Sequence, residues 1–185
     1  MLLKNPRTGI NISCHERKQG EKTLILIHGL SGNYTRWFKA AELLSGNRRV
    51  IDYDLRGHAE SDKGPGMGYT WDEHVEDLAG LMDALGVEKA TLAGHSMGGM
   101  IAQHFALKYP ERVERLVLVA TSACIMPGFF KSIAARLASW VARTFPNFIA
   151  SIIRKKNAGK PRELFPEFDR PELDFDDYAV ALCFS

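Results

Sequence analysis

The stretch LAGHSMGG, Leu92–Gly99, decides the fold because it places one serine between two closely spaced glycines. Ser96 ends a short apolar run and precedes a segment with helical spacing, so the pattern Gly-x-Ser-x-Gly falls at a strand-to-helix turn. A serine at the apex of such a turn has a strained backbone, and the chain beside it must be nearly devoid of side chains. Gly94 and Gly98 meet that need, and Gly99 allows close helix packing. The pattern therefore predicts a nucleophile elbow rather than a glycine-rich turn with an incidental serine.

The segments around the elbow alternate between strand and helix patterns. Unbroken apolar runs with β-branched residues favour strands that are covered on both faces, as in a parallel sheet. The order along the chain is strand Thr23–Ile27, helix Asn33–Leu44, strand Arg49–Tyr53, a helix opened by a capping box at Thr70 and closed by Gly86, strand Lys89–Gly94, helix Met97–Tyr109 and strand Leu116–Ala120. This alternation predicts an α/β fold with a mostly parallel sheet and helices on both faces.

Three motifs at the ends of these strands resemble those of the α/β-hydrolase superfamily. They are HG at 28–29, DLRGH at 54–58 and GHSMGG at 94–99, and they occur in the order and spacing of that family. The similarity covers roughly residues 10–125. One departure is Ala59, where the family usually has a second glycine. The resemblance implies the α/β-hydrolase fold and a serine hydrolase that cleaves a small carboxylic ester or related acyl substrate through an acyl-enzyme.

A serine hydroxyl needs a base to take its proton and two donors for the oxyanion that develops on the substrate. One donor is expected to be the backbone N–H of Met97, which follows Ser96 at the start of a helix. The resemblance places the second donor at the backbone N–H of Leu30. His28 and Gly29 are then expected to shape the turn that presents this donor. The expected supports of the elbow itself are Gly94, His95, Gly98 and Gly99.

The sequence offers no clear base for Ser96 and no clear acid to orient that base. The six histidines are His15, His28, His58, His74, His95 and His104. In the family the histidine lies far downstream of the serine, but His104 is only eight residues along the elbow helix, about 12 Å of axial rise away from Ser96. His58 is the one conceivable substitute, and His74 is expected to be a surface or boundary residue. No acceptable triad can be assembled, so we expect the acid and base to lie in sequence not present here.

The chain divides by composition into two parts. Residues 1–125 are expected to form the N-terminal portion of the hydrolase core, and residues 126–185 the start of a helical cap. One helical face of the cap is apolar and carries Phe129, Ile133, Leu137, Trp140 and Val141. We expect it to pack over the mouth of the active site; the alternative is a basic amphipathic lid that touches lipid. The strand Leu116–Ala120 is expected to be an uncovered apolar edge, which invites aggregation. Together with the missing acid and base, this edge leads us to expect a chain that is marginally stable and catalytically weak or silent.

Composition excludes several other kinds of protein. The 185 residues suffice for one sizeable core, and a net charge of +2 is too near balance to argue for nucleic-acid binding. Three scattered cysteines lack metal or disulfide spacing, so neither a metal site nor a cofactor is expected. The first residues lack the apolar core of a signal peptide, and no stretch is long enough to span a membrane, which favours a cytoplasmic protein.

Several activities remain open within the resemblance. Dehalogenases and epoxide hydrolases use aspartate at the elbow apex, and Ser96 argues against both. Haloperoxidase-like enzymes, thioesterases, lactonases and acyltransferases retain the serine. A non-catalytic relative that binds a ligand or partner is favoured by the absent downstream histidine and opposed by the intact elbow. The sequence specifies neither the acyl or alcohol group nor the oligomeric state.

Overall fold

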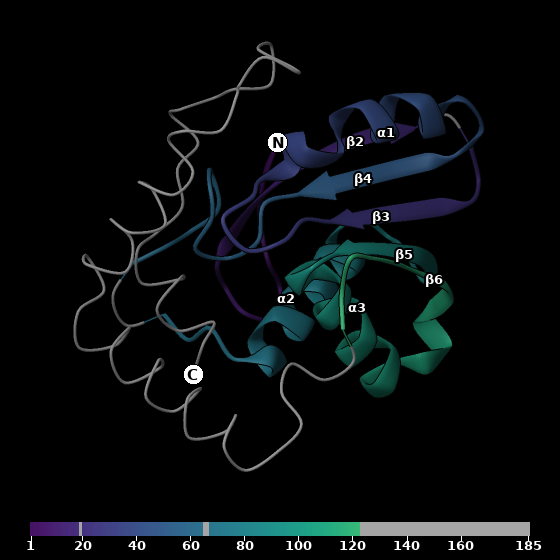
Figure 1. Ribbon diagram of the computed structural model, residues 1–185. Coiled ribbons are helices and arrows are strands. Elements are labelled where there is room, and N and C mark those ends of the chain that lie inside the picture. Colours follow the sequence, from purple (N-terminus) through teal and green to yellow (C-terminus); the bar gives the residue numbers. More distant parts are fainter. Residues whose placement is uncertain (19, 65–66, 123–185) are drawn as a thin grey trace.

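The computed structural model describes residues 1–18, 20–64 and 67–122, and these contain a single six-stranded sheet (Figure 1). Its order is β1-β2-β4-β3-β5-β6. The strands are β1 (Leu2–Lys4), β2 (Asn11–Lys18), β3 (Thr23–Ile27), β4 (Arg49–Tyr53), β5 (Ala90–His95) and β6 (Val113–Val119). Strands β4, β3, β5 and β6 are parallel, and β1 and β2 pair antiparallel at one side. The predicted α/β fold with a mostly parallel sheet is confirmed.

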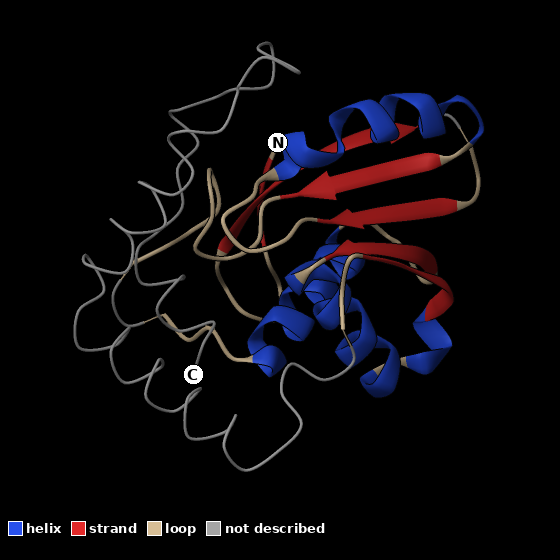
Figure 2. Ribbon diagram, in the orientation of Figure 1, coloured by secondary structure: helices blue, strands red, loops and turns tan. Residues whose placement is uncertain are grey.

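Helices cover both faces of this sheet (Figure 2). The helical elements are η1 (Tyr34–Trp37), α1 (Phe38–Leu44), η2 (Ser45–Asn47), α2 (Trp71–Ala84), α3 (Met97–Lys108) and η3 (Pro110–Arg112). Helix α1 lies on one face, and α2 and α3 lie together on the other. The core is divided in the same way, because the apolar side chains of the central strands alternate between a larger cluster on the side of α2 and α3 and a smaller one on the side of α1.

One expected helix is shorter than its sequence pattern. The segment from Asn33 begins as the 3-10 helix η1, because the Asn33 side chain accepts the N–H of Thr35, and becomes α-helical only at Phe38. Ala41 is fully buried beneath α1, whereas Leu44 is 42% exposed. The helix ends at Leu44, as its sequence pattern predicts.

The capping box at the start of α2 is present as predicted. The Glu73 N–H donates to the Thr70 hydroxyl over 3.3 Å, and the Glu73 carboxylate accepts the Thr70 N–H over 2.8 Å. Two of the N–H groups that a helix start leaves unsatisfied are bonded in this way. The helix begins at a defined residue as a result, and its inner face is aligned with the sheet.

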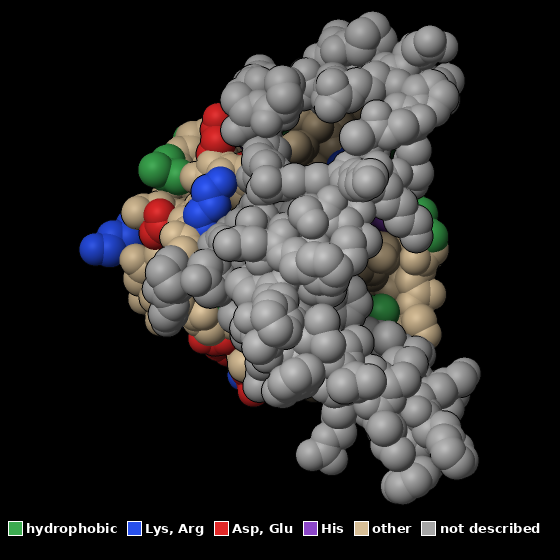
Figure 3. Space-filling model, turned by 60° about the vertical axis from the view of Figure 1, so that its left-hand side comes forward, with side chains coloured by type: hydrophobic (Ala, Val, Ile, Leu, Met, Phe, Trp, Pro, Cys, Tyr) green, Lys and Arg blue, Asp and Glu red, His purple; other side chains and the backbone are tan. Residues whose placement is uncertain are grey.

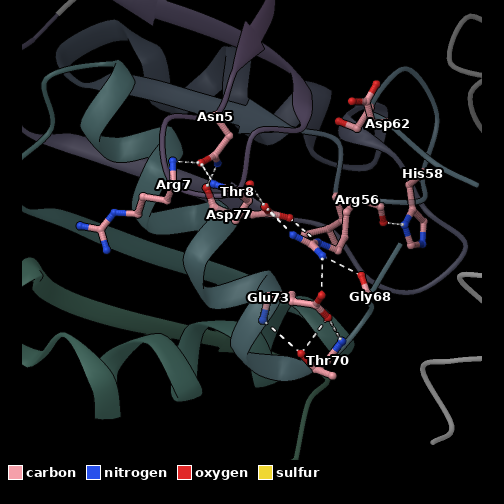
Figure 4. Close-up of polar contacts among 12 residues, drawn as sticks. Asn5, Arg7, Thr8, Arg56, His58, Asp62, Gly68, Thr70, Glu73 and Asp77 are labelled. Atoms are coloured by element: carbon pink, nitrogen blue, oxygen red, sulfur yellow. Dashed lines mark hydrogen bonds and ion pairs between the residues drawn. The ribbon is translucent and has the colours of Figure 1, made fainter. Parts of the chain in front are cut away.

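A buried ion pair joins the DLRGH loop to α2 (Figure 4). Arg56 donates two parallel hydrogen bonds to Asp77, from Nε over 2.6 Å and from Nη2 over 2.8 Å, and the side chains are 4% and 2% exposed. A third donation goes from Nη1 to the carbonyl of Gly68. Thr8 adds a hydroxyl bond to Asp77 over 2.7 Å. This network fixes the loop after β4 to the helix that follows it and to the N-terminal turn.

Strand β6 lies at the edge of the sheet, and its apolar side chains are uncovered within the described part of the chain. The residues from Leu116 to Val119 are 38–46% exposed. The prediction of an apolar edge strand is therefore confirmed. Such an edge is a template for pairing with another strand.

The described surface carries both signs of charge. On the face shown in Figure 3, basic and acidic side chains lie close to one another outside the grey region. Among the helices of the described residues, none combines the length and the apolarity that crossing a lipid bilayer requires.

Removal of Asp77 tests the buried ion pair. The substitution Asp77→Ala leaves the guanidinium of Arg56 buried without its carboxylate, so we expect the free energy of unfolding to fall by about 3–5 kcal/mol. Urea denaturation measures this change. The control is Asp72→Ala, whose carboxylate is 82% exposed and pairs with Lys108, and we expect it to cost no more than about 1 kcal/mol. Equal losses in the two variants would contradict the assignment.

Two alanines adopt left-handed backbone conformations, Ala59 at φ 44° and Ala120 at φ 46°. Glycine relieves this strain, so Ala120→Gly, at an exposed position, is expected to raise the free energy of unfolding by about 0.5–1 kcal/mol. Ala59→Gly is expected to raise the free energy of unfolding by a smaller amount, because it also removes a buried methyl group. Thermal unfolding of both variants measures the effect. The control is Ala106→Gly within α3, which is expected to lower the free energy of unfolding by about 1 kcal/mol. If Ala120→Gly destabilised the protein, the backbone at Ala120 would not be strained.

Candidate active site

Ser96 is the single residue between the end of β5 and the start of α3. Its backbone has φ 52° and ψ −118°, and its side chain is half-buried. A positive φ is uncommon for a residue with a Cβ and costs of order 1–3 kcal/mol, so it persists only where the surroundings enforce it. The strand-to-helix turn at Ser96 is therefore strained, and Ser96 is its single apical residue.

Backbone crowding explains the glycines on either side of the serine. A Cβ built on Gly94 would overlap the carbonyl of Gly98, and one built on Gly98 would overlap the carbonyl of Ile27 at the end of β3. Both clashes involve backbone atoms, which cannot move aside as a flexible side chain can. A Cβ on Gly99 would lie 2.6 Å from the side chain of Thr121. The elbow is thus enclosed by its own helix, by β3 and by the segment after β6.

The loop after β3 lies directly against the serine. A Cβ built on Gly29 would lie 3.1 Å from the Cβ of Ser96 and 3.1 Å from Nδ1 of the exposed His95. The loop closes on itself through a hydrogen bond from the N–H of Gly32 to the carbonyl of Gly29 over 3.0 Å. Leu30 lies within this turn and packs against the larger core cluster. The two segments expected to supply oxyanion donors therefore meet at one place.

Met97 lies on the other side of the serine, as the first residue of α3. Its side chain is 5% exposed and belongs to the larger core cluster. Its backbone N–H belongs to the first turn of the helix, where amide groups point out along the helix axis and carry partial positive charge. A developing negative charge next to Ser96 would be stabilised at this position.

His28 is fully buried and joins two loops. Its Nε2 accepts the N–H of Leu55 over 3.0 Å, so the ring proton is on Nδ1, which donates to the carbonyl of Gly29 over 2.8 Å. Burial lowers the pKa of His28 well below its usual value, and the His58 ring acts in the same direction. The ring is therefore neutral and holds the loop after β3 to the loop after β4. This geometry fits the structural part expected for His28.

Two other histidines have partners away from the serine, and no hydrogen bond joins a described histidine to the Ser96 hydroxyl. His58 is fully buried, and its Nδ1 bonds to the carbonyl of Arg56 over 2.9 Å. His104 stacks on Trp71, with 5.2 Å between ring centroids, on the surface between α2 and α3.

The placement of His74 corrects an expectation. It was expected at the surface or boundary, but it is 1% exposed, and burial lowers the pKa of its ring to about 3. His74 faces inward together with Val75 and Leu78. Its place four residues before Leu78, at the border of the apolar face, is a sequence signal for partial burial but not for how complete that burial is.

Asp54 begins the DLRGH motif and is also buried. Its carboxylate accepts the N–H of Tyr34 over 2.9 Å and that of Glu60 over 3.4 Å. Burial raises the pKa of Asp54 to about 6. The carboxylate thus ties the loop after β4 to η1, and it supports the sheet edge at which the serine lies.

Comparison with known proteins gives the family. A family model described as the alpha/beta hydrolase fold matches residues 22–175, which is most of the chain. The chain belongs to the α/β hydrolase fold family. Its curated relatives include the dihydrolipoyllysine-residue acetyltransferase component of an acetoin cleaving system from Pseudomonas putida, 41% identical over 104 residues that are 56% of this chain and 28% of that protein. They also include 2-hydroxymuconate semialdehyde hydrolase from Pseudomonas sp. (strain CF600), 36% identical over 64% of this chain and 43% of that protein.

A solved structure of a thermophilic esterase from Thermogutta terrifontis is similar over 98% of this α/β hydrolase chain and 69% of the esterase, with 32% identity and a TM-score of 0.75. The chain spans less than half the length of the two curated relatives. The expected division into a core at 1–125 and a cap at 126–185 stays a prediction, because the described residues end at Ser122 and the expected cap lies outside them.

The raised pKa of Asp54 predicts a pH dependence of stability. Between its unfolded value near pH 4 and about pH 6, the folded protein binds more protons than the unfolded chain, so the free energy of unfolding falls as the pH rises. We expect Asp54→Asn, which keeps an acceptor for Tyr34, to reduce this fall by about 2 kcal/mol. Urea midpoints at several pH values from 4 to 7 measure the slope. An identical slope in both proteins would show that Asp54 titrates normally.

Proposed function

We propose that this α/β hydrolase is a serine hydrolase in which Ser96 is the nucleophile. The observation that supports this most strongly is the strained backbone of Ser96, at φ 52°, between β5 and α3 and against the loop of Gly29. A protein that only folds or binds gains nothing from a serine held at this cost, whereas a serine at the apex of such a turn suits attack on a carbonyl.

In the proposed reaction, the Ser96 Oγ attacks the carbonyl carbon of the substrate while a base accepts the hydroxyl proton. The carbonyl oxygen becomes an oxyanion, and the N–H groups of Met97 and Leu30 donate to it. Each such donor contributes about 3–4 kcal/mol to stabilising the transition state. Collapse of the intermediate breaks the bond to the leaving alcohol, which takes up the proton, and leaves an acyl-serine that water then hydrolyses.

The residues assigned here are the nucleophile and the oxyanion donors. No histidine follows His104 in this sequence, and His28, His58 and His104 have partners away from the Ser96 hydroxyl. A positioned base contributes about 10²–10⁴-fold to such a reaction. We therefore expect the hydroxyl of this chain to react slowly.

A small carboxylic ester or related acyl compound is the proposed substrate class. The similarity to the Thermogutta terrifontis esterase, which extends over 98% of this chain, supports it. The second candidate is acyl transfer, because an acyl-serine can pass its acyl group to an acceptor other than water, and one relative is named as an acetyltransferase component. Product analysis with and without an added alcohol or thiol acceptor separates the two.

Labelling with a fluorophosphonate tests the nucleophile, because such a probe phosphonylates an activated serine and releases fluoride. We expect slow incorporation of one label, located on Ser96 by peptide mass spectrometry, and none in Ser96→Ala. Ser45→Ala is the matched control, since its hydroxyl bonds to Glu42 far along the chain from the elbow, and it should label as the wild type does. Absence of any label, or a label that persists in Ser96→Ala, contradicts the proposed function.

A further inference from the structure

The segment that follows β6 bonds both backbone polar groups of Ser96. The Ser96 N–H donates to the carbonyl of Val119 over 3.0 Å, which extends the pairing of β5 with β6 by one residue. The hydroxyl of Thr121 donates to the carbonyl of Ser96 over 2.6 Å. Between these two contacts Ala120 adopts φ 46°, a left-handed conformation that turns the chain back toward the elbow. One short segment therefore holds Ser96 from both sides of its backbone.

Thr121 is seated against the first turn of α3. A Cβ on Gly99 would lie 2.6 Å from the Cβ and Cγ2 of Thr121, so glycine at this position admits the threonine side chain. Gln103 links α3 to the segment after β6. Its Nε2 donates to the carbonyl of Gly99 over 3.1 Å and to that of Ser122 over 3.3 Å. Packing against helix α3 thus holds Thr121 where its hydroxyl reaches the carbonyl of Ser96.

The carbonyl of Ser96 and the N–H of Met97 belong to the same planar peptide group. Fixing the direction of the carbonyl therefore fixes the direction of the N–H, which points the opposite way. The Ser96 carbonyl also accepts the N–H groups of Gly99 over 3.0 Å and Met100 over 3.3 Å, so within the described part of the chain Thr121 adds the one bond that comes from outside α3. Hydrogen bonds to a carbonyl polarise the amide and strengthen its N–H as a donor.

We propose that Thr121 is a positioning residue for the oxyanion site, acting through the Ser96–Met97 peptide. Its hydroxyl orients this peptide so that the Met97 N–H is directed to the place where the oxyanion forms. The effect of Thr121 on catalysis rests on the proposed function, in which Ser96 is the nucleophile. The orientation of the peptide itself is a property of the folded chain and can be measured without any reaction.

The test uses the full 185-residue chain and three variants. Thr121→Val removes the hydroxyl and keeps the shape, whereas Thr121→Ser keeps the hydroxyl. Thr8→Val is the control, because it also removes a part-buried hydroxyl, one that bonds to Asp77 over 2.7 Å in the network beside α2. Should Thr121→Val not fold, Thr121→Ala serves as the second variant without a hydroxyl.

Amide resonances of the elbow are the primary measurement. In Thr121→Val, we expect shifted ¹H and ¹⁵N resonances of Met97 and about two- to tenfold faster hydrogen exchange of the Ser96 amide, as the loss of one hydrogen bond implies. Thr121→Ser should restore both quantities toward wild type, and Thr8→Val should leave both at wild-type values. Unchanged elbow amides in Thr121→Val, or no restoration by Thr121→Ser, overturn the proposal.

The rate of fluorophosphonate labelling at Ser96 is the second measurement. Where the wild type is labelled, Thr121→Val should slow labelling about two- to tenfold and Thr121→Ser should restore it, and equal rates in Thr121→Val and wild type overturn the catalytic part of the proposal. Where the wild type is not labelled, the proposed function fails, and the amide measurement alone decides whether Thr121 orients the peptide.

Discussion

The rest of the site depends on the left-handed backbone of Ser96. An ordinary helical or extended conformation at this residue would carry β5 straight past the site or turn α3 in another direction. The observed φ of 52° is enforced from several sides: by the backbone approach at Gly94 and Gly98, by the bond to Val119, and by the α3 amides that bond to the Ser96 carbonyl. A strain energy of order 1–3 kcal/mol is small beside the free energy that packing of the surrounding core contributes, so the folded chain can hold Ser96 in this conformation.

The parallel sheet brings the parts of the site together. Strands β3 and β5 pair in parallel, with Ile27 opposite Gly94, so the loop of His28 and Gly29 and the elbow emerge at the same sheet edge. Strand β4 pairs with β3 on its other side and delivers the DLRGH loop there, where Leu55 bonds to His28. Ligands of open α/β sheets bind outside the carboxyl ends of the strands. The position of Ser96 at this edge follows from strand order and not from any one loop.

Local sequence patterns predicted much of this arrangement. The strands Thr23–Ile27 and Arg49–Tyr53 are both observed with the expected bounds, because central parallel strands are apolar without interruption. The antiparallel strands β1 and β2 were not predicted, since β2 carries polar residues and lies toward the side of the sheet. The complete burial of His74 and the contact of Thr121 with Ser96 were also beyond local patterns. Both depend on tertiary packing, and the second joins residues that lie 25 positions apart.

The central claim is that the Ser96 backbone is held at positive φ in the folded chain. Its most direct test is the φ angle of Ser96 in solution, from the coupling between its amide and α protons together with the ¹³C shifts of its Cα and Cβ. We expect a positive φ near the 52° of the structure at Ser96, flanked by extended residues of β5 and helical residues of α3. An ordinary negative φ at Ser96 in an otherwise folded protein would contradict it.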